Sequence, residues 1–260
     1  MFKNKSLIKT FNFILASATP ILLVAIWQIL SSKGIINQSI MPAPSIILRN
    51  FIEMIKTGEL EGHLAISAVR VIKGFTVGAS LGIIFGILIG LFKKIDTATT
   101  FLIGILRPIP NIAWIPMLIL WMGIDEGSKV SVIAIGSFWP ILINTIHGIK
   151  STDKKLLEVA YILEKSNIEV LTKIVFPAAL PAIFTGVRLG VSTSWMCVVG
   201  AEMIAASKGI GYLIMFAREL SQPDIMLVGV FSIGFIGLLI DVVLINLQRR
   251  VLKWNFEHGR

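Results

Sequence analysis

Six apolar blocks, each close to the length that crosses a lipid bilayer, dominate this chain. A transmembrane helix needs about 20 predominantly apolar residues. Charged residues make up only 15% of the 260 residues, whereas soluble domains carry about a quarter. The sequence therefore predicts an all-α fold, a polytopic membrane protein with six transmembrane helices in a single domain, residues 1–260. The expected spans are Phe13–Leu30, Ser67–Phe92, Thr99–Trp121, Val130–His147, Ile183–Ala205 and Ile225–Leu247.

Basic residues are concentrated on one side of the expected bundle. Clusters of Lys and Arg precede the first span, separate the fourth span from the fifth, and follow the last span. Cytoplasmic loops carry an excess of these residues, so both termini and the segment 151–181 are expected to face the cytoplasm. Basic residues that flank membrane spans also account for the net charge of +9. We therefore expect no nucleic-acid partner.

The N-terminus also has features of a secretory signal. Lysines within residues 3–9 precede an apolar run, and Ala16–Ala18 resembles a cleavage site. The apolar run continues to Leu30, which is longer than a typical signal core. The sequence therefore favours an uncleaved first span over a leader that is removed.

Between the first and second spans, the sequence predicts an amphipathic helix. Ser45 suits the N-cap position of this helix, which is expected to run through Ile55. Gly58 then provides a stop signal.

Glycine recurs at every fourth position of the second expected span. The residues are Gly74, Gly78, Gly82, Gly86 and Gly90. This spacing places them along one helix face, where another helix can approach closely. Static close packing is favoured, and a sliding surface for conformational change is the alternative.

Prolines interrupt the third and fourth expected spans. Arg107-Pro108-Ile109-Pro110 and Pro116 lie in the third span, and Pro140 lies in the fourth. A backbone carbonyl freed by a proline is tolerated in a membrane only where protein or a water-filled cavity satisfies it. Kinked helices that line a pathway and kinks that serve packing alone are both consistent with this pattern.

Ionisable side chains lie in or near the apolar blocks, at Arg107, Arg188, Glu202 and Asp241. A charge at the centre of a membrane helix costs at least about 2.5 kcal/mol for Arg or Asp on insertion scales. Such residues are therefore candidates for a site, although an ion pair or snorkelling to the interface can also explain Arg188 and Asp241. Arg107 could attract an anion at the mouth of a pathway, and an anchor for its helix near the inner end is the alternative. The candidate residues for a translocation pathway are Arg107, Trp114, Arg188, Ser194, Trp195 and Glu202.

The sequence has no pattern typical of a catalytic or metal centre. The single cysteine, Cys197, and the three histidines share no ligand spacing. A Gly-x4-Gly-Lys-Ser/Thr phosphate-binding loop does not occur. We therefore expect no enzyme activity and no cofactor, and any ATP must be hydrolysed by another chain.

The segment between the fourth and fifth spans is polar yet patterned. Thr152 or Asp153 can cap a first helix, and a second helix is expected from about Asn167 to Pro177. Exposed amphipathic helices suit docking into a groove of a partner, and a loop folded against its own bundle is the alternative. The apolar stripe of the first helix consists of Leu156, Leu157, Ala160 and Leu163.

This segment resembles the cytoplasmic motif of binding-protein-dependent ABC importer permeases. That motif reads Glu-Ala-Ala, three residues, Gly, nine residues, Ile, one residue, Leu-Pro. The chain has the same spacing, with Glu158-Val159-Ala160, then Glu164 at the Gly position, then Ile174-Val175-Phe176-Pro177. The missing glycine is the main departure, because it normally sits at the turn between the two helices. Asn167 tolerates left-handed backbone and could shift the turn.

Further stretches extend the resemblance to nearly the whole chain and to the nitrate, sulfonate and taurine branch. The resemblance implies the type I importer fold, a homodimer with a second permease copy, two cytoplasmic ATPase subunits that bind the ATP, and an external substrate-binding protein. It implies a multi-pass protein of a bacterial inner (plasma) membrane that moves a small anionic nutrient, either aliphatic sulfonate or taurine, or nitrate or bicarbonate. The stretches are Pro42–Ser45, Arg70–Gly90, Arg107–Pro110, Trp121–Gly123, Pro177–Pro181, Gly200–Met203 and Lys208–Leu213.

The resemblance also implies which residues contact the ATPase. Glu158 is expected to be the polar anchor, with Ala160 and Leu163 as packing contacts. A secondary transporter that works without an ATPase is the alternative function, but it would leave the patterned segment unexplained. The implied coupling residues are Glu158, Ala160, Leu163, Glu164, Ile174 and Pro177.

Overall fold

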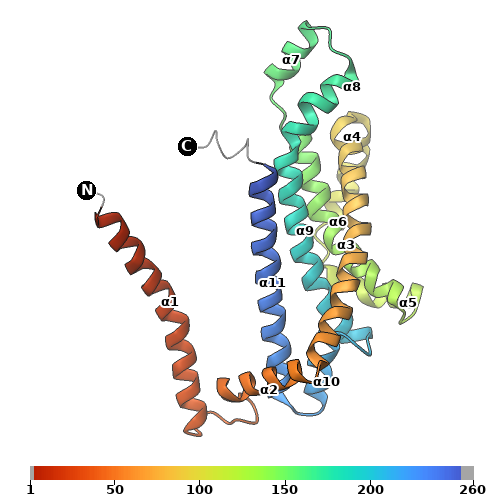
Figure 1. The fold of residues 1–260 in the computed structure, drawn as a ribbon. Helices are drawn as coiled ribbons and strands as arrows, with labels where there is room; N and C mark the ends of the chain where they lie inside the picture. Colours follow the sequence, from red (N-terminus) through yellow and green to blue (C-terminus); the bar gives the residue numbers. More distant parts are fainter. Residues whose placement is uncertain (1–2, 253–260) are drawn as a thin grey trace. The chain divides into compact units, whose positions relative to one another are not determined.

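The computed structural model describes the backbone of residues 3–252 and the side chains of residues 15 and 18–252. This part of the chain consists of helices and their connections, which confirms the expected all-α fold (Figure 1). The elements are α1 (Lys3–Ser32), α2 (Pro44–Lys56), α3 (Glu59–Leu91), α4 (Lys93–Leu106), η1 (Asn111–Trp114), α5 (Ile115–Met122), α6 (Glu126–Lys150), α7 (Lys154–Ile162), α8 (Asn167–Val170), η2 (Leu171–Val175), α9 (Phe176–Ala205), α10 (Ile210–Glu219) and α11 (Pro223–Val251).

The chain divides into two compact units. The first unit comprises Met1–Gly62 and Leu213–Ser232, and the second comprises His63–Tyr212 and Ile233–Arg260. All candidate pathway and coupling residues therefore belong to the second unit.

Several helices are long and apolar enough to cross a membrane. In the described part of the chain these are α3, α6, the run Asn167–Ala205 and α11, and α4 with η1 and α5 adds a fifth if the bent pair counts as one span. The first expected span lies in α1, whose described apolar part is Ala18–Ser32. A polytopic helical membrane protein with four to five spans is thus confirmed, and the sixth span stays a prediction.

The third expected span, Thr99–Trp121, is wrong as a single straight helix. α4 ends at Leu106, and the helical residues from Asn111 onwards run at 89° to it. Pro108 and Pro110 cause the bend, because a proline has no backbone N–H and disfavours helical backbone in the residue before it. Pro116 lies instead in the first turn of α5, where a missing N–H breaks no helical bond.

The expected helix end at Pro177 is also wrong. One helical run continues from Asn167 to Ala205, and Pro177 lies in the first turn of α9. The preceding stretch, Leu171–Val175, has the wider π-helical form, which gives the proline ring room against the turn before it. The second helix of the patterned segment is therefore the beginning of the helix that carries the fifth expected span.

The glycine stripe of α3 faces α6, and the two helices run side by side (Figure 1). A Cβ atom added at Gly86 would lie 2.6 Å from the Cβ of Thr145, and one at Gly82 would lie 3.0 Å from the carbonyl oxygen of Phe138. Such distances are too short for larger side chains, so the glycines are needed for close approach. The expected close packing is thus confirmed, and a sliding surface stays a prediction.

α6 and α9 form a second close helix pair in the same unit. Gly148 packs on the backbone of Ala179, and Gly136 packs on Cys197. The buried thiol of Cys197 lies within the apolar core that the two helices share. That core also contains Val71, Ile115, Val132, Ile133, Trp195 and Val198.

In the first unit, α2 begins two residues earlier than the sequence predicted. The expected N-cap, Ser45, is wrong: Ala43 occupies that position and Pro44 the first turn, where its fixed φ suits a helix. Ser45 donates its backbone N–H to Oε1 of Gln28 at 3.0 Å, and its hydroxyl accepts from Nε2 of Gln28 at 3.1 Å. Gly58, the expected stop, follows the helix with φ of 73°.

Candidate functional site

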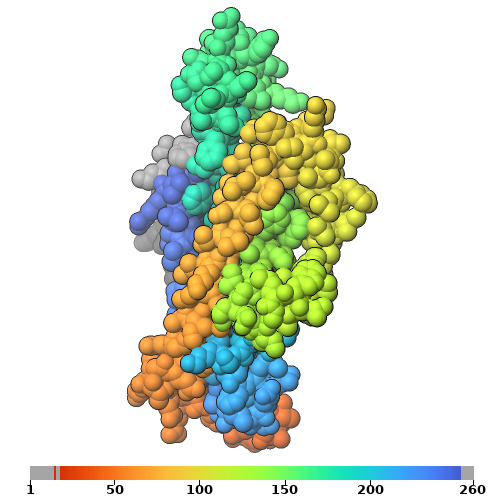
Figure 2. Space-filling view, turned by 90° about the vertical axis from the view of Figure 1, so that its right-hand side faces the viewer, coloured from red at the N-terminus to blue at the C-terminus, as the bar shows by residue number. Residues whose placement is uncertain are grey.

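The patterned segment, Ser151–Pro181, is called the coupling segment here. Its helices α7 and α8 extend beyond the ends of α6 and α9 in Figure 1, and they form a projecting end in the space-filling view of Figure 2. Both helices belong to the second unit. The segment is therefore available to another molecule at this end of the unit.

Local hydrogen bonds shape both helices of the coupling segment. The Asp153 carboxylate accepts from the N–H of Lys155 at 2.9 Å and caps α7, as the sequence predicted. α8 begins with a capping box, in which the Ser166 hydroxyl accepts from the Glu169 N–H and the Glu169 carboxylate accepts from the Ser166 N–H. Such caps fix a helix start because they satisfy backbone donors that the helix itself leaves free.

The turn between α7 and α8 is built on Glu164. Its N–H donates to the Tyr161 carbonyl, and the Lys165 N–H donates to the Ala160 carbonyl, which is the Schellman arrangement of a helix C-terminus. Glu164 has φ of 49°, at the position where glycine is usual. The predicted shift of the turn to Asn167 is wrong, because Asn167 is already the first residue of α8 and Glu164 adopts the left-handed backbone itself.

The coupling segment has two distinct faces. On the inner face, Leu157, Val170 and Leu171 pack against a buried cluster in the same unit, and Ala160 is buried. The outer face exposes apolar side chains that nothing in the described part of the chain covers. Its residues are Leu156, Val159, Tyr161, Ile162, Leu163 and Ile168, with Tyr161 86% exposed.

The other coupling residues lie on or beside this outer face. Glu158 and Pro177 are exposed, and Ile174 is half-buried. Glu158 makes no ion pair within the residues that the structure describes. The outer face therefore combines a free carboxylate with exposed apolar side chains.

Arg107 lies at the bend that follows α4 and lines a hollow of about 400 Å³ in the second unit. The hollow is called the Arg107 hollow here. Trp114, the next candidate along the chain, lies in η1 outside this lining and is half-buried. Its indole N–H is buried and has no hydrogen-bond acceptor among the described residues.

Arg188, Ser194 and Trp195 all belong to α9 but have different surroundings. Arg188 donates to both carboxylate oxygens of Asp241 on α11, at 2.7 and 3.0 Å, which is the ion pair that the sequence analysis weighed. Ser194 and Trp195 are buried. The Ser194 hydroxyl is 3.4 Å from the Ile133 carbonyl, and the Trp195 indole donates to the Ile233 carbonyl at 3.1 Å.

Glu202 lies at the centre of a buried polar network. Its carboxylate accepts from Arg70 at 2.7 Å, from the Ser67 hydroxyl at 2.8 Å and from the Gly211 N–H at 3.0 Å. Arg70 also donates through two nitrogens to Glu126, at 2.6 and 2.8 Å. These residues form the Arg70–Glu202 network, which joins α3, α6, α9 and α10.

Sequence reasoning identified Glu202 but not its partners. Ser67 and Arg70 are distant in sequence from Glu202 and lie at the start of an apolar block, where a basic residue suggests only a flanking charge. The capping box at Ser166 was also overlooked, although Ser followed by Glu three residues later is a recognised signal.

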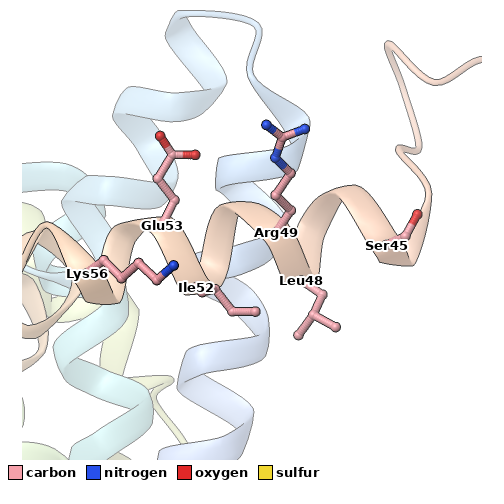
Figure 3. Close-up of a pocket in the computed structure, with 6 residues that line it drawn as sticks. All are labelled: Ser45, Leu48, Arg49, Ile52, Glu53 and Lys56. Atoms are coloured by element: carbon pink, nitrogen blue, oxygen red, sulfur yellow. The ribbon is translucent and has the colours of Figure 1, made fainter.

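A second hollow, of about 440 Å³, lies along α2 in the first unit. Figure 3 shows that Arg49 and Glu53 point to one side of α2 and Leu48 to the other. The lining carries both charge signs, from Arg49, Glu53 and Lys56. It therefore has no charge pattern that selects an anion, unlike the Arg107 hollow.

Long apolar helices, a bent helix pair and an exposed coupling segment define the membrane subunit of a transport system. The family described as "Binding-protein-dependent transport system inner membrane component" matches residues 78–253. This chain belongs to that family, which confirms the resemblance seen in the sequence. It is thus a multi-pass transport permease and not an enzyme, in an inner-membrane system that works with an ATPase and a binding protein.

Relatives and solved structures agree with this assignment. The chain is 39% identical over 246 residues to SsuC of Bacillus subtilis (strain 168), named for aliphatic sulfonates transport, with 95% of this chain and 89% of SsuC covered. It is 31% identical to the taurine transport system permease protein TauC of Escherichia coli (strain K12), with 94% and 90% covered. The fold matches a chain of the MetNI methionine ABC transporter, with a TM-score of 0.62, 16% identity, and 71% and 92% covered.

Proposed function

We propose that this chain is the permease of an ATP-driven importer of the type I fold, working as a homodimer with two ATPase subunits. Six spans place both termini and the coupling segment in the cytoplasm of a bacterial cell, and an external binding protein delivers the substrate. The chain acts as one permease domain.

The exposed outer face of the coupling segment carries this proposal. Tyr161, Ile162 and Leu163 present apolar surface on a helix that local caps hold in shape. Apolar helix faces of this kind bind in grooves of partner proteins. Glu158 supplies a charged contact on the same helix, and Leu163 keeps its expected role as a packing contact. Ala160, which was expected to pack on the ATPase too, is 2% exposed and packs within its own chain instead.

The substrate is a small anionic nutrient. Relatives named for aliphatic sulfonate and for taurine transport support a sulfonate, and nitrate or bicarbonate is the alternative within the branch. The binding protein performs most of the selection.

The test is the Glu158→Lys variant, expressed with the ATPase and the binding protein. We expect transport and co-purification of the ATPase to fail while the protein still inserts in the membrane, because the reversed charge opposes docking. Glu219→Lys is the matched control, since Glu219 is also exposed but lies in α10. Normal transport by Glu158→Lys would show that the docking role is wrong.

A secondary transporter makes the opposite prediction for the ATPase. Its uptake would persist in cells or vesicles that lack every ATPase subunit. Uptake that stops when the ATPase is removed, and returns when it is supplied, supports the importer instead.

A further inference from the structure

The Arg107 hollow lies midway along the helices of the second unit. Its wall is formed by the bend after α4, by the middle of α6 and by the middle of α9. Its volume of about 400 Å³ is within the range of about 300–1,000 Å³ that small-molecule sites occupy. The lining residues that matter here are Arg107, Asn111, Trp139, Asn144, Leu189 and Thr193.

The guanidinium of Arg107 is the only ionised group among the described residues that line the hollow. Two other arginines in the expected spans are neutralised: Arg70 pairs with Glu126 and Glu202, and Arg188 pairs with Asp241. Arg107 has no carboxylate partner within the described part of the chain. Arg107 is exposed, so its guanidinium is open to a ligand, and an anion in the hollow would supply the missing counter-charge.

The opposite wall contains Pro140, which lies inside the continuous helix α6. This proline leaves the Gly136 carbonyl without its helical donor, and the Thr193 hydroxyl donates to that oxygen at 2.7 Å. Asn144 in turn donates through Nδ2 to the Pro140 carbonyl at 2.8 Å. The Thr193 hydroxyl thus satisfies the one carbonyl that Pro140 leaves free, and the Asn144 amide adds a second donor to the Pro140 carbonyl. Neither oxygen therefore faces an anion without a donor.

The rest of the lining is apolar or uncharged. Trp139 and Leu189 offer room for a short carbon chain beside the guanidinium. No carboxylate lines the hollow in the described part of the chain, so an ammonium group would find no counter-charge. The hollow thus suits an oxyanion head, which the fork of N–H donors on an arginine binds well, attached to an uncharged body.

We propose that the Arg107 hollow is a substrate subsite for alkanesulfonates, with Arg107 as the residue that binds the sulfonate, and that it favours them over zwitterionic aminosulfonates such as taurine. This inference rests on the proposed importer function. It adds a selective element within the permease itself, beyond the binding protein.

The test uses the complete complex in proteoliposomes, with labelled ethanesulfonate delivered by the cognate binding protein. Arg107→Gln is expected to lower ATP-driven uptake at least about tenfold, because a charge-assisted contact is lost, while ATPase turnover and complex assembly stay unchanged. Arg107→Lys, which keeps the charge but not the fork, should retain intermediate uptake. Arg249→Gln, at the exposed end of α11, is the matched control and should transport normally.

A second measurement is equilibrium binding of labelled ethanesulfonate to the purified complex without the binding protein. Unlabelled ethanesulfonate should compete at least about tenfold better than taurine, and Arg107→Gln should abolish the binding. ATP-driven uptake that Arg107→Gln leaves unchanged, or equal competition by taurine, overturns the subsite alone. If wild-type uptake needs no ATP while Arg107→Gln still lowers uptake, the importer function is overturned and the subsite is supported.

Discussion

The coupling segment and the Arg70–Glu202 network lie at opposite ends of the helical run Asn167–Ala205, and they are held in place in different ways. The coupling segment is exposed and is shaped by neighbours in sequence, as in the capping box of Ser166 and Glu169. The network is buried at Arg70 and Glu202 and exposed only at Glu126. It joins residues far apart in the chain, such as Arg70 and Glu202, which are 132 positions apart. One end leaves apolar surface exposed, which the proposed function assigns to a partner, and the other is fixed within the protein.

The difference sets the energetic consequences of mutation at each end. Exposed ion pairs, such as Lys173 with Glu169 in the coupling segment, contribute little because water and salt screen them. Removing one member of a buried pair leaves an uncompensated charge and is strongly destabilising. Charge substitutions should therefore affect stability at the network and partner binding at the coupling segment.

The largest expected effect comes from Arg70→Met, which keeps the bulk of the side chain and removes its charge. The Glu202 carboxylate, 0% exposed as a side chain, would then lack its cationic partner, and we expect a loss of about 3–5 kcal/mol in stability. Thermal unfolding of the purified complex measures it. Lys173→Met is the matched control and should change stability by no more than about 1 kcal/mol. Equal losses in the two variants would contradict the comparison.

A smaller loss of stability is expected from Gly209→Ala, which strains the backbone next to the network. Gly209 has φ of 124°, a conformation that costs other residues about 1–3 kcal/mol, and an added Cβ would meet the Glu202 carboxylate. Gly104→Ala in α4 is the control, because nothing lies within 4 Å of its added Cβ. Thermal unfolding should separate the two variants, and an unchanged melting temperature for Gly209→Ala would show that the loop adapts freely.

The smallest effect, and one of opposite sign, is expected from Glu164→Gly in the coupling segment. Glycine adopts the left-handed backbone of the turn without a steric penalty, so the α7–α8 turn should gain about 1 kcal/mol in local stability. Slower amide hydrogen exchange in α7 measures the gain, and transport should be retained. Ser166→Ala removes the α8 cap and should lower the local stability of α8 by a similar free energy, so amide exchange in α8 should be faster. Faster exchange in Glu164→Gly would mean that the carboxylate stabilises the turn.

The same contrast explains how much could be predicted from the sequence. The apolar blocks, the glycine stripe, the Asp153 cap and the start of α8 depend on local patterns, and the sequence predicted each of them. The partners of Glu202 were not predicted, because no local pattern connects Arg70 to it, whereas the ion pair of Arg188 with Asp241 was weighed because both charges lie in apolar blocks. The two errors at Pro108–Pro110 and Pro177 have one cause: a proline can bend a helix or be accommodated in a wider turn, and packing decides between the two.

The uninterrupted helix from Asn167 onwards has a mechanical consequence. Thr193, on the wall of the Arg107 hollow, lies about 39 Å along this helix from Asn167, at about 1.5 Å per residue. In the proposed importer, a rod of that length would carry a small tilt at the coupling segment to the hollow as a larger displacement. The π-helical stretch Leu171–Val175 lies between these two places, so the stiffness of its wider turns would set how much of the tilt is transmitted.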